Sequence, residues 1–182
     1  MSLEFFRPPL EYPRIRYDQM LSHGAARYPE NVAVVFRDVS LTYRELEAMT
    51  DRFARALASL GVSRGDRVCL LTPNCPEYII AFYAIARVGA IASPMNPSYR
   101  EREIEYQLND TEAVAIVAHT SLVPLLEAVR ARTPGLRHVI AVGPGQASSA
   151  SVRSFIDLVA NQPAAPPASV EIGENEIGRA HV

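Results

Sequence analysis

The histidines and cysteines of this sequence are the side chains best suited to act as nucleophiles, general bases or metal ligands. The four histidines are His23, His119, His138 and His181. They are scattered along the chain, and no nucleophile is arranged around any of them, so surface or structural roles are the better interpretation. The two cysteines, Cys69 and Cys75, offer two ligands where zinc needs three or four. We therefore predict no catalytic residue, no cofactor-binding residue and no metal ligand in this chain.

Two further features invite a chemical interpretation. Cys75 stands at the start of a predicted helix, where a thiol pKa can be lowered, although a structural role is favoured for both cysteines. The run Gly143-Pro144-Gly145 follows a predicted strand, as phosphate-binding loops do. It has only two glycines, its proline lacks an N–H, and an Ala/Ser-rich stretch replaces the expected helix start. We interpret it as a surface turn.

The stretch Val68 to Pro97 predicts the centre of the fold. An apolar strand at 68–71 is followed by a helix with Asn74 as N-cap, Pro76 in the first turn and Gly89 after its end. No charged residue occurs from Tyr78 to Ala86, so this helix must be covered on all sides, with its aromatic residues in packing roles. A short strand at 91–92 completes a parallel strand–helix–strand unit.

The rest of the chain continues the alternation of strands and helices. Asp18 is predicted to cap a helix with Met20, Leu21 and Ala25 on its apolar face, and Ser121 to cap another. Thr42 and Glu45 form a capping box for a long amphipathic helix. The other predicted elements are a hairpin (32–36 and 39–41), a charged helix from 100, strands at 113–118 and 138–142, and a short helix at 154–159. This order predicts a layered α/β/α fold with a mostly parallel sheet.

Composition limits the class of protein. The chain has 182 residues, 48% of them hydrophobic and 21% charged, which is typical of a globular protein with a sizeable core. A net charge of −2 and the lack of a basic cluster argue against a nucleic-acid partner. No signal peptide and no apolar run near 18 residues is found, so we expect no membrane span and a cytoplasmic location.

The sequence also predicts how the chain is divided. Residues 1–17 are expected to form an extended lead-in, and residues 18–160 an α/β subdomain. Residues 161–182 form a Pro/Ala-rich linker and an acidic tail, in which 178–182 are expected to be non-native.

Several motifs, in consistent order and spacing, resemble the N-terminal part of the adenylate-forming superfamily, which includes acyl-CoA synthetases, peptide-synthetase adenylation domains and luciferases. The motifs are Leu41-Thr-Tyr-Arg-Glu-Leu46, Gly61-Val-Ser-Arg-Gly-Asp-Arg-Val68, Pro73-Asn-Cys-Pro-Glu-Tyr78, Ala84-Ile-Ala-Arg-Val-Gly-Ala-Ile-Ala-Ser-Pro-Met-Asn-Pro97 and Glu103-Ile-Glu-Tyr-Gln-Leu-Asn-Asp110. The resemblance implies an ATP-dependent ligase that uses Mg²⁺ and coenzyme A. It would join a carboxylic acid, expected to be a fatty acid, to AMP and then transfer the acyl group to the thiol. Which acid is used, and whether the thiol belongs to coenzyme A or to a carrier protein, stays open.

The resemblance also implies what this chain lacks. Family members bind ATP with a Ser/Thr/Gly-rich loop ending in lysine, expected just beyond Ile177, and this sequence contains neither that loop nor any lysine. We therefore expect a truncated subdomain that is inactive alone, binds none of the three cofactors tightly, and self-associates through exposed apolar surface. Asn96 and Tyr99 are expected to approach the missing part. The alternatives are a non-catalytic scaffold module with the same fold and, less favoured without a glycine-rich loop, an unrelated nucleotide-binding α/β domain.

Overall fold

A parallel sheet forms the middle layer of the molecule. The computed structural model describes residues 15–145, 151–163 and 165–171. The five strands are ordered β4-β3-β5-β6-β7, and every neighbouring pair is parallel. Their bounds are β3 (Arg67–Leu71), β4 (Ile91–Pro94), β5 (Ala115–His119), β6 (His138–Val142) and β7 (Val152–Ser154).

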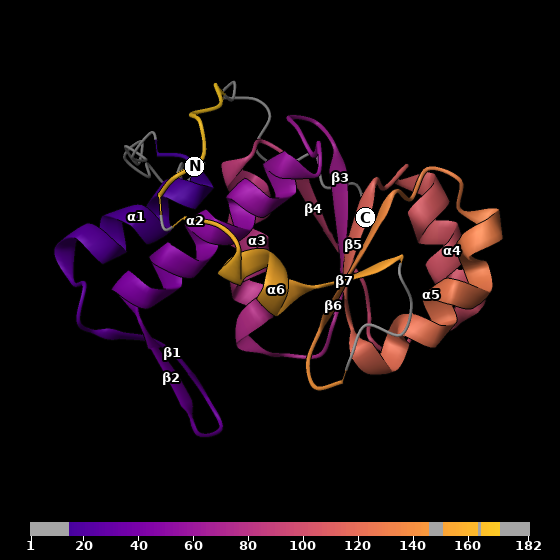
Figure 1. The fold of residues 1–182 in the computed structure, drawn as a ribbon, viewed down its shortest axis with the longest axis horizontal. Coiled ribbons are helices and arrows are strands. Elements are labelled where there is room, and N and C mark those ends of the chain that lie inside the picture. Colours follow the sequence, from indigo (N-terminus) through magenta and orange to yellow (C-terminus); the bar gives the residue numbers. More distant parts are fainter. Residues whose placement is uncertain (1–14, 146–150, 164, 172–182) are drawn as a thin grey trace, which may run out of the picture.

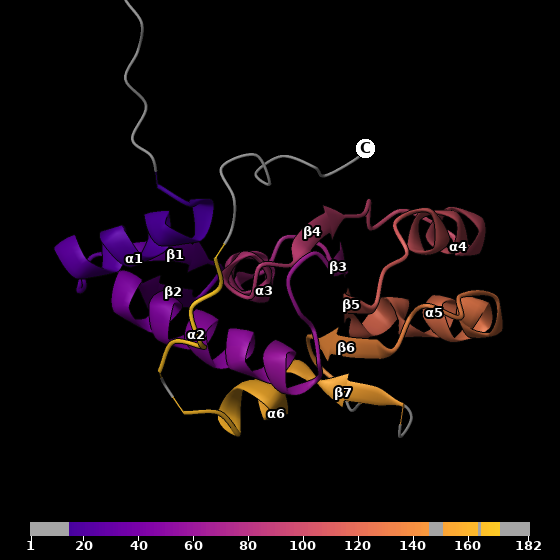
Figure 2. The ribbon, with the colours of Figure 1, turned by 90° about the horizontal axis from the view of Figure 1, so that it is seen from above.

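Helices cover both faces of this sheet (Figures 1 and 2). On one side lie α2 (Tyr43–Ser59), α3 (Pro76–Arg87) and α6 (Phe155–Ala160), and α1 (Tyr17–Arg27) packs against α2 and α3. On the other side lie α4 (Glu101–Asp110) and α5 (Val123–Val129), the latter between the 3₁₀ turns Thr120–Leu122 and Arg130–Arg132. The predicted α/β/α layering is therefore confirmed.

The alternation of side chains along β3 explains why both faces are covered. Val68 and Leu70 enter one apolar core, which also holds Phe53 and Ile85 from the helices. Cys69 and Leu71 point the opposite way into a second core, which contains Ile104, Leu108 and Leu126 among others. Because successive residues of a strand face opposite sides of the sheet, a continuous apolar run requires a helical layer on each side.

The long helix α2 forms as its sequence predicts. The Glu45 amide donates to the Thr42 hydroxyl, and the Thr42 amide donates to the Glu45 carboxylate, which completes the capping box. Leu46, Phe53 and Leu57 are buried along one side of the helix. Residue 61 ends it with a φ of +78°, a conformation that favours glycine.

Helix α3 is central, but its start differs from the prediction. Its N-cap is Cys75, with no side-chain cap bond, so the assignment of Asn74 was wrong. Pro76 takes the first helical position, where its fixed φ and missing N–H suit it, and the residue before it becomes the N-cap. Every residue of α3 is buried or half-buried, which confirms that the helix is covered all round.

Two other predicted caps were also wrong. The N-cap of α1 is Arg16, and Asp18 lies inside the first turn, where it accepts two hydrogen bonds from the Arg16 guanidinium. Met20 is 55% exposed, so it does not belong to the buried side of α1, whereas Leu21 does. His119 caps the 3₁₀ turn that precedes α5, in the place predicted for Ser121. In both cases the cap lies two residues before the predicted one, within the range over which sequence patterns leave a helix end undefined.

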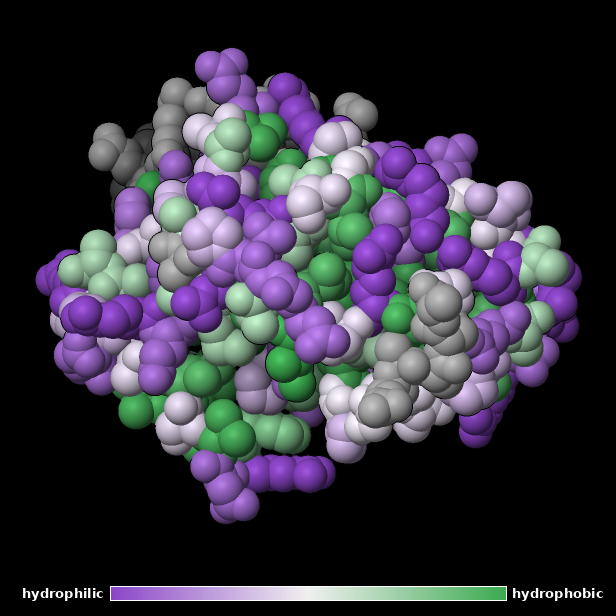
Figure 3. All heavy atoms as spheres, in the orientation of Figure 1, coloured by the Kyte–Doolittle hydropathy of each residue, from purple (hydrophilic) through white to green (hydrophobic). Residues whose placement is uncertain are grey.

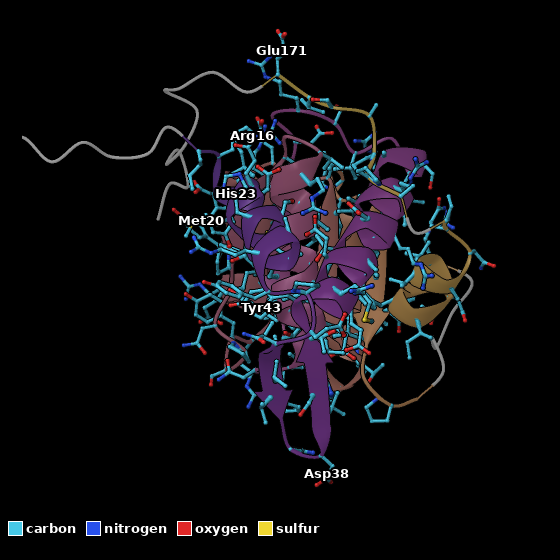
Figure 4. All side chains as sticks on the ribbon, turned by 90° about the vertical axis from the view of Figure 1, so that its left-hand side faces the viewer. Arg16, Met20, His23, Asp38, Tyr43 and Glu171 are labelled. Carbon is cyan, nitrogen blue, oxygen red and sulfur yellow. The ribbon has the colours of Figure 1, made fainter. Side chains whose placement is uncertain are left out.

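The predicted hairpin forms a separate two-stranded sheet. Strands β1 (Val32–Phe36) and β2 (Val39–Thr42) are antiparallel and project from the helical layer (Figure 1). Arg37 has a φ of +52° in the turn, a conformation for which such turns favour glycine. Figure 4 shows Asp38 at the far tip. Val32, Val35 and Val39 are exposed, Val35 by 70%, and Figure 3 shows hydrophobic surface over this part of the molecule.

Strand β7 was not predicted. It has three residues and pairs with β6 at the edge of the sheet, and its last residue, Ser154, caps α6. So short a strand gives no alternating pattern to detect. Within the part of the chain that the structure describes, no helix has both the length and the apolar character that a membrane crossing requires.

Candidate functional site

The strand order places the best candidate site at the carboxyl edge of the sheet. After β3 the chain adds β4 on one side, and it then crosses to the other side to add β5. In open parallel sheets ligands bind outside the carboxyl ends of the strands, at the point where the order reverses. Here that point lies between the ends of β3 and β5, at Thr72 and His119.

A buried threonine, Thr72, lies on the β3 side of this point. The Thr72 hydroxyl donates to the Pro73 carbonyl at 2.8 Å and lies 3.6 Å from the sulfur of Cys75. Burial raises the pKa of the Cys75 thiol, so the lowered pKa considered from its place at a helix start was wrong. Burial also raises the pKa of Cys69, which lies in the core. Neither thiol is activated as a nucleophile.

The β5 side carries a histidine that is engaged in local structure. His119 Nδ1 lies 2.8 Å from the Ser121 hydroxyl oxygen and accepts the Ser121 amide at 3.3 Å. The other ring nitrogen packs against residue 143, where an added Cβ would lie 2.6 Å from Nε2. Because Nδ1 accepts the Ser121 amide, the ring acts as the N-cap of this 3₁₀ turn.

Of the other histidines, His23 and His138 are described by the structure, and neither lies near His119. His23 is exposed on α1, and His138 is half-buried at the start of β6, the opposite end of that strand from the candidate site. Burial lowers the pKa of His138. His181 lies outside the described residues.

A small hollow lies beside His119. Its lining comes from the carboxyl ends of β5, β6 and β7 and from the first turn of α3: Glu77, Thr120, Ala141, Val142, Gly143, Gly145, Ser154, Phe155 and Ile156. The Thr120 hydroxyl donates to the Pro144 carbonyl, and the Ser154 hydroxyl accepts the Asp157 amide. Pro144 and Gly145 are exposed, as expected of a surface turn.

This hollow does not fit a nucleoside triphosphate. Among the described residues of its lining, the one ionisable side chain is Glu77, whose carboxylate would repel phosphates, and the hydroxyls of Thr120 and Ser154 already have partners. Among the described residues no group of three or more His, Cys, Asp or Glu side chains could hold a metal ion. The assignment of no catalytic, cofactor or metal residue remains a prediction.

The loop after β4 was predicted to face the rest of a larger protein. Asn96 is exposed, and its side-chain oxygen accepts the Ser98 amide at 2.9 Å. Tyr99 is half-buried against the second core. Both lie near the carboxyl end of β4, at one edge of the sheet. Their role at an interface stays a prediction.

A buried charged cluster was missed by the sequence reasoning. Arg87, at the end of α3, forms ion pairs with Glu47 and Asp51 of α2, and its guanidinium also donates to the Ser22 hydroxyl of α1 at 3.1 Å. Burial raises the pKa of Asp51, and Arg87 opposes that rise. The sequence signal that could have revealed the cluster is Arg87 itself, a charged residue directly after the uncharged run from Tyr78 to Ala86. The cluster joins α1, α2 and α3, so its role is structural.

Replacing Gly143 by alanine should destabilise the protein for two reasons, the positive φ of this residue and a clash with the His119 ring. Its φ is +97°, and its Cβ would also meet the His119 ring, so we expect a loss of about 1–3 kcal/mol in a urea titration. Gly65→Ala is the matched control, since Gly65 has a φ of +83° and open space around it. Equal losses for both variants would contradict the His119 contact.

The family of the chain follows from comparison with known proteins. A model of the family "AMP-binding enzyme" matches residues 21–172, which include the whole parallel sheet and the hairpin. The chain belongs to the AMP-binding enzyme family. A long-chain-fatty-acid–CoA ligase of Yersinia pestis is 37% identical over 155 residues, which are 83% of this chain and 27% of that ligase. The chain thus spans little more than a quarter of the length of this AMP-binding relative.

Solved structures of AMP-binding enzymes share the same fold. The anthranilate CoA ligase AuaEII, in complex with anthranoyl-AMP, is similar with a TM-score of 0.79 and 29% identity, over 83% of this chain and 29% of that one. The N-terminal domain of FACL13 from Mycobacterium tuberculosis gives a TM-score of 0.76 and 30% identity, over 86% and 38%. These likenesses confirm the fold class.

Proposed function

We propose that this chain forms the N-terminal part of an ATP-dependent acid–thiol ligase. Such a ligase activates a carboxylic acid as its acyl-adenylate, releases pyrophosphate and passes the acyl group to a thiol, with coenzyme A as the proposed acceptor. ATP, Mg²⁺ and coenzyme A are cofactors of that larger enzyme. The observation that carries the proposal is the 37% identity with a long-chain-fatty-acid–CoA ligase over nearly the whole folded part of the chain.

A fatty acid is the proposed substrate, because the curated relatives that match carry that name in Yersinia pestis and in Bacillus subtilis alike. The similar AuaEII structure is named for a different carboxylic acid, anthranilate. The shared chemistry is therefore activation of a carboxylate. The carboxyl edge described above supplies no residue that would select the acid, so selection is proposed to lie in other parts of the ligase.

We further propose that the 182 residues alone do not activate an acid. The described lining of the hollow at the carboxyl edge carries one carboxylate, Glu77, and no cationic side chain, and the sequence has no lysine of the kind that ends the phosphate loop of the family. Purified chain incubated with Mg²⁺, ATP and palmitate is expected to release no more pyrophosphate than a blank. Release that depends on palmitate would contradict this expectation.

A chimera tests the proposed function itself. Residues 17–171 of this chain would replace the aligned segment of the Yersinia pestis ligase. We expect the chimera to release pyrophosphate when a long-chain fatty acid is added, because the two segments share sequence and fold. The same chimera with Arg87→Ala, which should destabilise the inserted segment, serves as a control for whether release depends on folding of that segment. A folded, monodisperse chimera without acid-dependent release would contradict the proposal.

A further inference from the structure

The last described segment, residues 165–171, lies across the helical layer without forming a helix or a strand. It follows α6 and runs past α2 and the end of α3 to the start of α1. Figure 4 shows Arg16 and Glu171 at the same end of the molecule. The segment therefore brings positions that are more than a hundred residues apart in sequence into contact.

Two arginines hold this segment by its main chain. Arg55 of α2 donates from Nε to the Ala165 carbonyl at 2.7 Å and from Nη2 to the Pro166 carbonyl at 2.9 Å. Arg16 donates from Nη1 to the Val170 carbonyl at 2.6 Å. The other nitrogens of Arg16 bind the buried Asp18 carboxylate, which fixes the direction of its guanidinium.

An apolar contact adds to these bonds at the end of α3. The side chain of Val170 lies over Gly89, where an added Cβ would be 2.9 Å from the valine Cγ1. Gly89 has a φ of +75°, which already favours glycine, and the passing segment leaves no room for a side chain. Each of α1, α2 and α3 therefore contributes a contact to the segment or to the turn beneath it.

We propose that residues 165–171 are a releasable strap, which fastens the three helices together. The strap is held through carbonyl oxygens and one valine, so most of its side chains are free to vary. It has no ladder of backbone hydrogen bonds, and Pro166, Ala168 and Ser169 are exposed. A segment with so few contacts opens with a smaller free energy than the whole protein. The family match ends at residue 172, next to the end of the strap.

Native-state proteolysis of the 182-residue chain tests the strap independently of any ligase activity. Thermolysin can cleave before Ala168 and before Val170 only when the strap is open, and mass spectrometry identifies these cuts. Loss of both bonds from Arg55 in Arg55→Ala should raise the rate of these cuts about tenfold. Arg55→Lys should give an intermediate rate, since an ammonium group cannot reproduce the two-pronged contact.

One control variant and one further test variant separate release of the strap from general destabilisation of the protein. Arg44→Ala removes another arginine of α2, whose ion pair with Glu30 is exposed, and should leave the cleavage rate unchanged. Val170→Gly removes the apolar contact and should speed the cut before Ala168. The proposal is overturned if Arg55→Ala cleaves at the wild-type rate. It is also overturned if cuts throughout the chain accelerate equally and in step with a lower urea midpoint.

Discussion

Replacing Arg87 by alanine should lower the free energy of unfolding by about 3–5 kcal/mol, because it leaves the buried Asp51 carboxylate and the half-buried Glu47 carboxylate without their partner. Asp51 is 8% exposed and Arg87 7%, so bulk water screens this ion pair only weakly. The Ser22 hydroxyl would lose its bond to Arg87 as well. The measurement is a urea titration followed by circular dichroism, with the midpoint and slope compared to those of the wild type.

A matched control makes the Arg87 result specific. Arg44→Ala breaks an exposed ion pair with Glu30 and should cost no more than about 1 kcal/mol. Replacing the buried pair by Arg87→Met with Asp51→Leu should recover part of the loss, since a buried pair can often be exchanged for apolar residues. If Arg87→Ala were no more costly than Arg44→Ala, the cluster would not be buried as described.

Replacing Phe53 by alanine should cost about 3–5 kcal/mol, as is usual for a fully buried aromatic residue. Its ring centroid lies 4.4 Å from that of Phe155, and the two rings join α2 to α6 inside the first core. Phe155→Ala should have a similar effect, and the double variant should lose less than the sum, because the two side chains share one contact. The measurement is again a urea titration.

The comparison residue for this pair is on α6 itself. Ile156 is next to Phe155 in sequence but is 66% exposed, so Ile156→Ala should change stability by less than about 0.5 kcal/mol. A small loss for Phe155→Ala, similar to that for Ile156→Ala, would mean that α6 does not pack on the sheet.

The elements with strong local signals were predictable from sequence. The capping box of Thr42 and Glu45, the buried run of β3 and the apolar α3 each follow from the residue types within a few positions. Such features depend on neighbouring residues alone, so no knowledge of distant contacts is needed. The resemblance in motif order identified the family, which the comparisons then confirmed.

The features that were missed depend on residues far apart in the chain. The strand order places β4 and β5 on opposite sides of β3, and no local pattern reveals this. The three-residue β7 forms only because β6 offers an edge. Arg87 looks like an ordinary helix end until α2 places Glu47 and Asp51 beside it. The contacts of residues 165–171 with Arg16 and Arg55 likewise require the folded helices.

The candidate site shows the same division. The surface turn at residues 143–145 could be inferred from its glycines and proline, and Pro144 and Gly145 are exposed as that interpretation expects. The packing of His119 on Gly143 could not be inferred, because two strands must first bring the residues together. Cys75 was considered for a lowered pKa from its helix position alone, but burial has the larger effect and raises it.

The most direct test of the proposed ligase role is to follow both half-reactions in the chimera with the Yersinia pestis ligase. With ATP, Mg²⁺ and palmitate but no coenzyme A, mass spectrometry should detect palmitoyl-AMP. Addition of coenzyme A should convert this adenylate to palmitoyl-CoA with release of AMP. If the chimera is folded yet forms neither product, while the parent ligase forms both in parallel, this chain does not serve as the N-terminal part of an acid–thiol ligase.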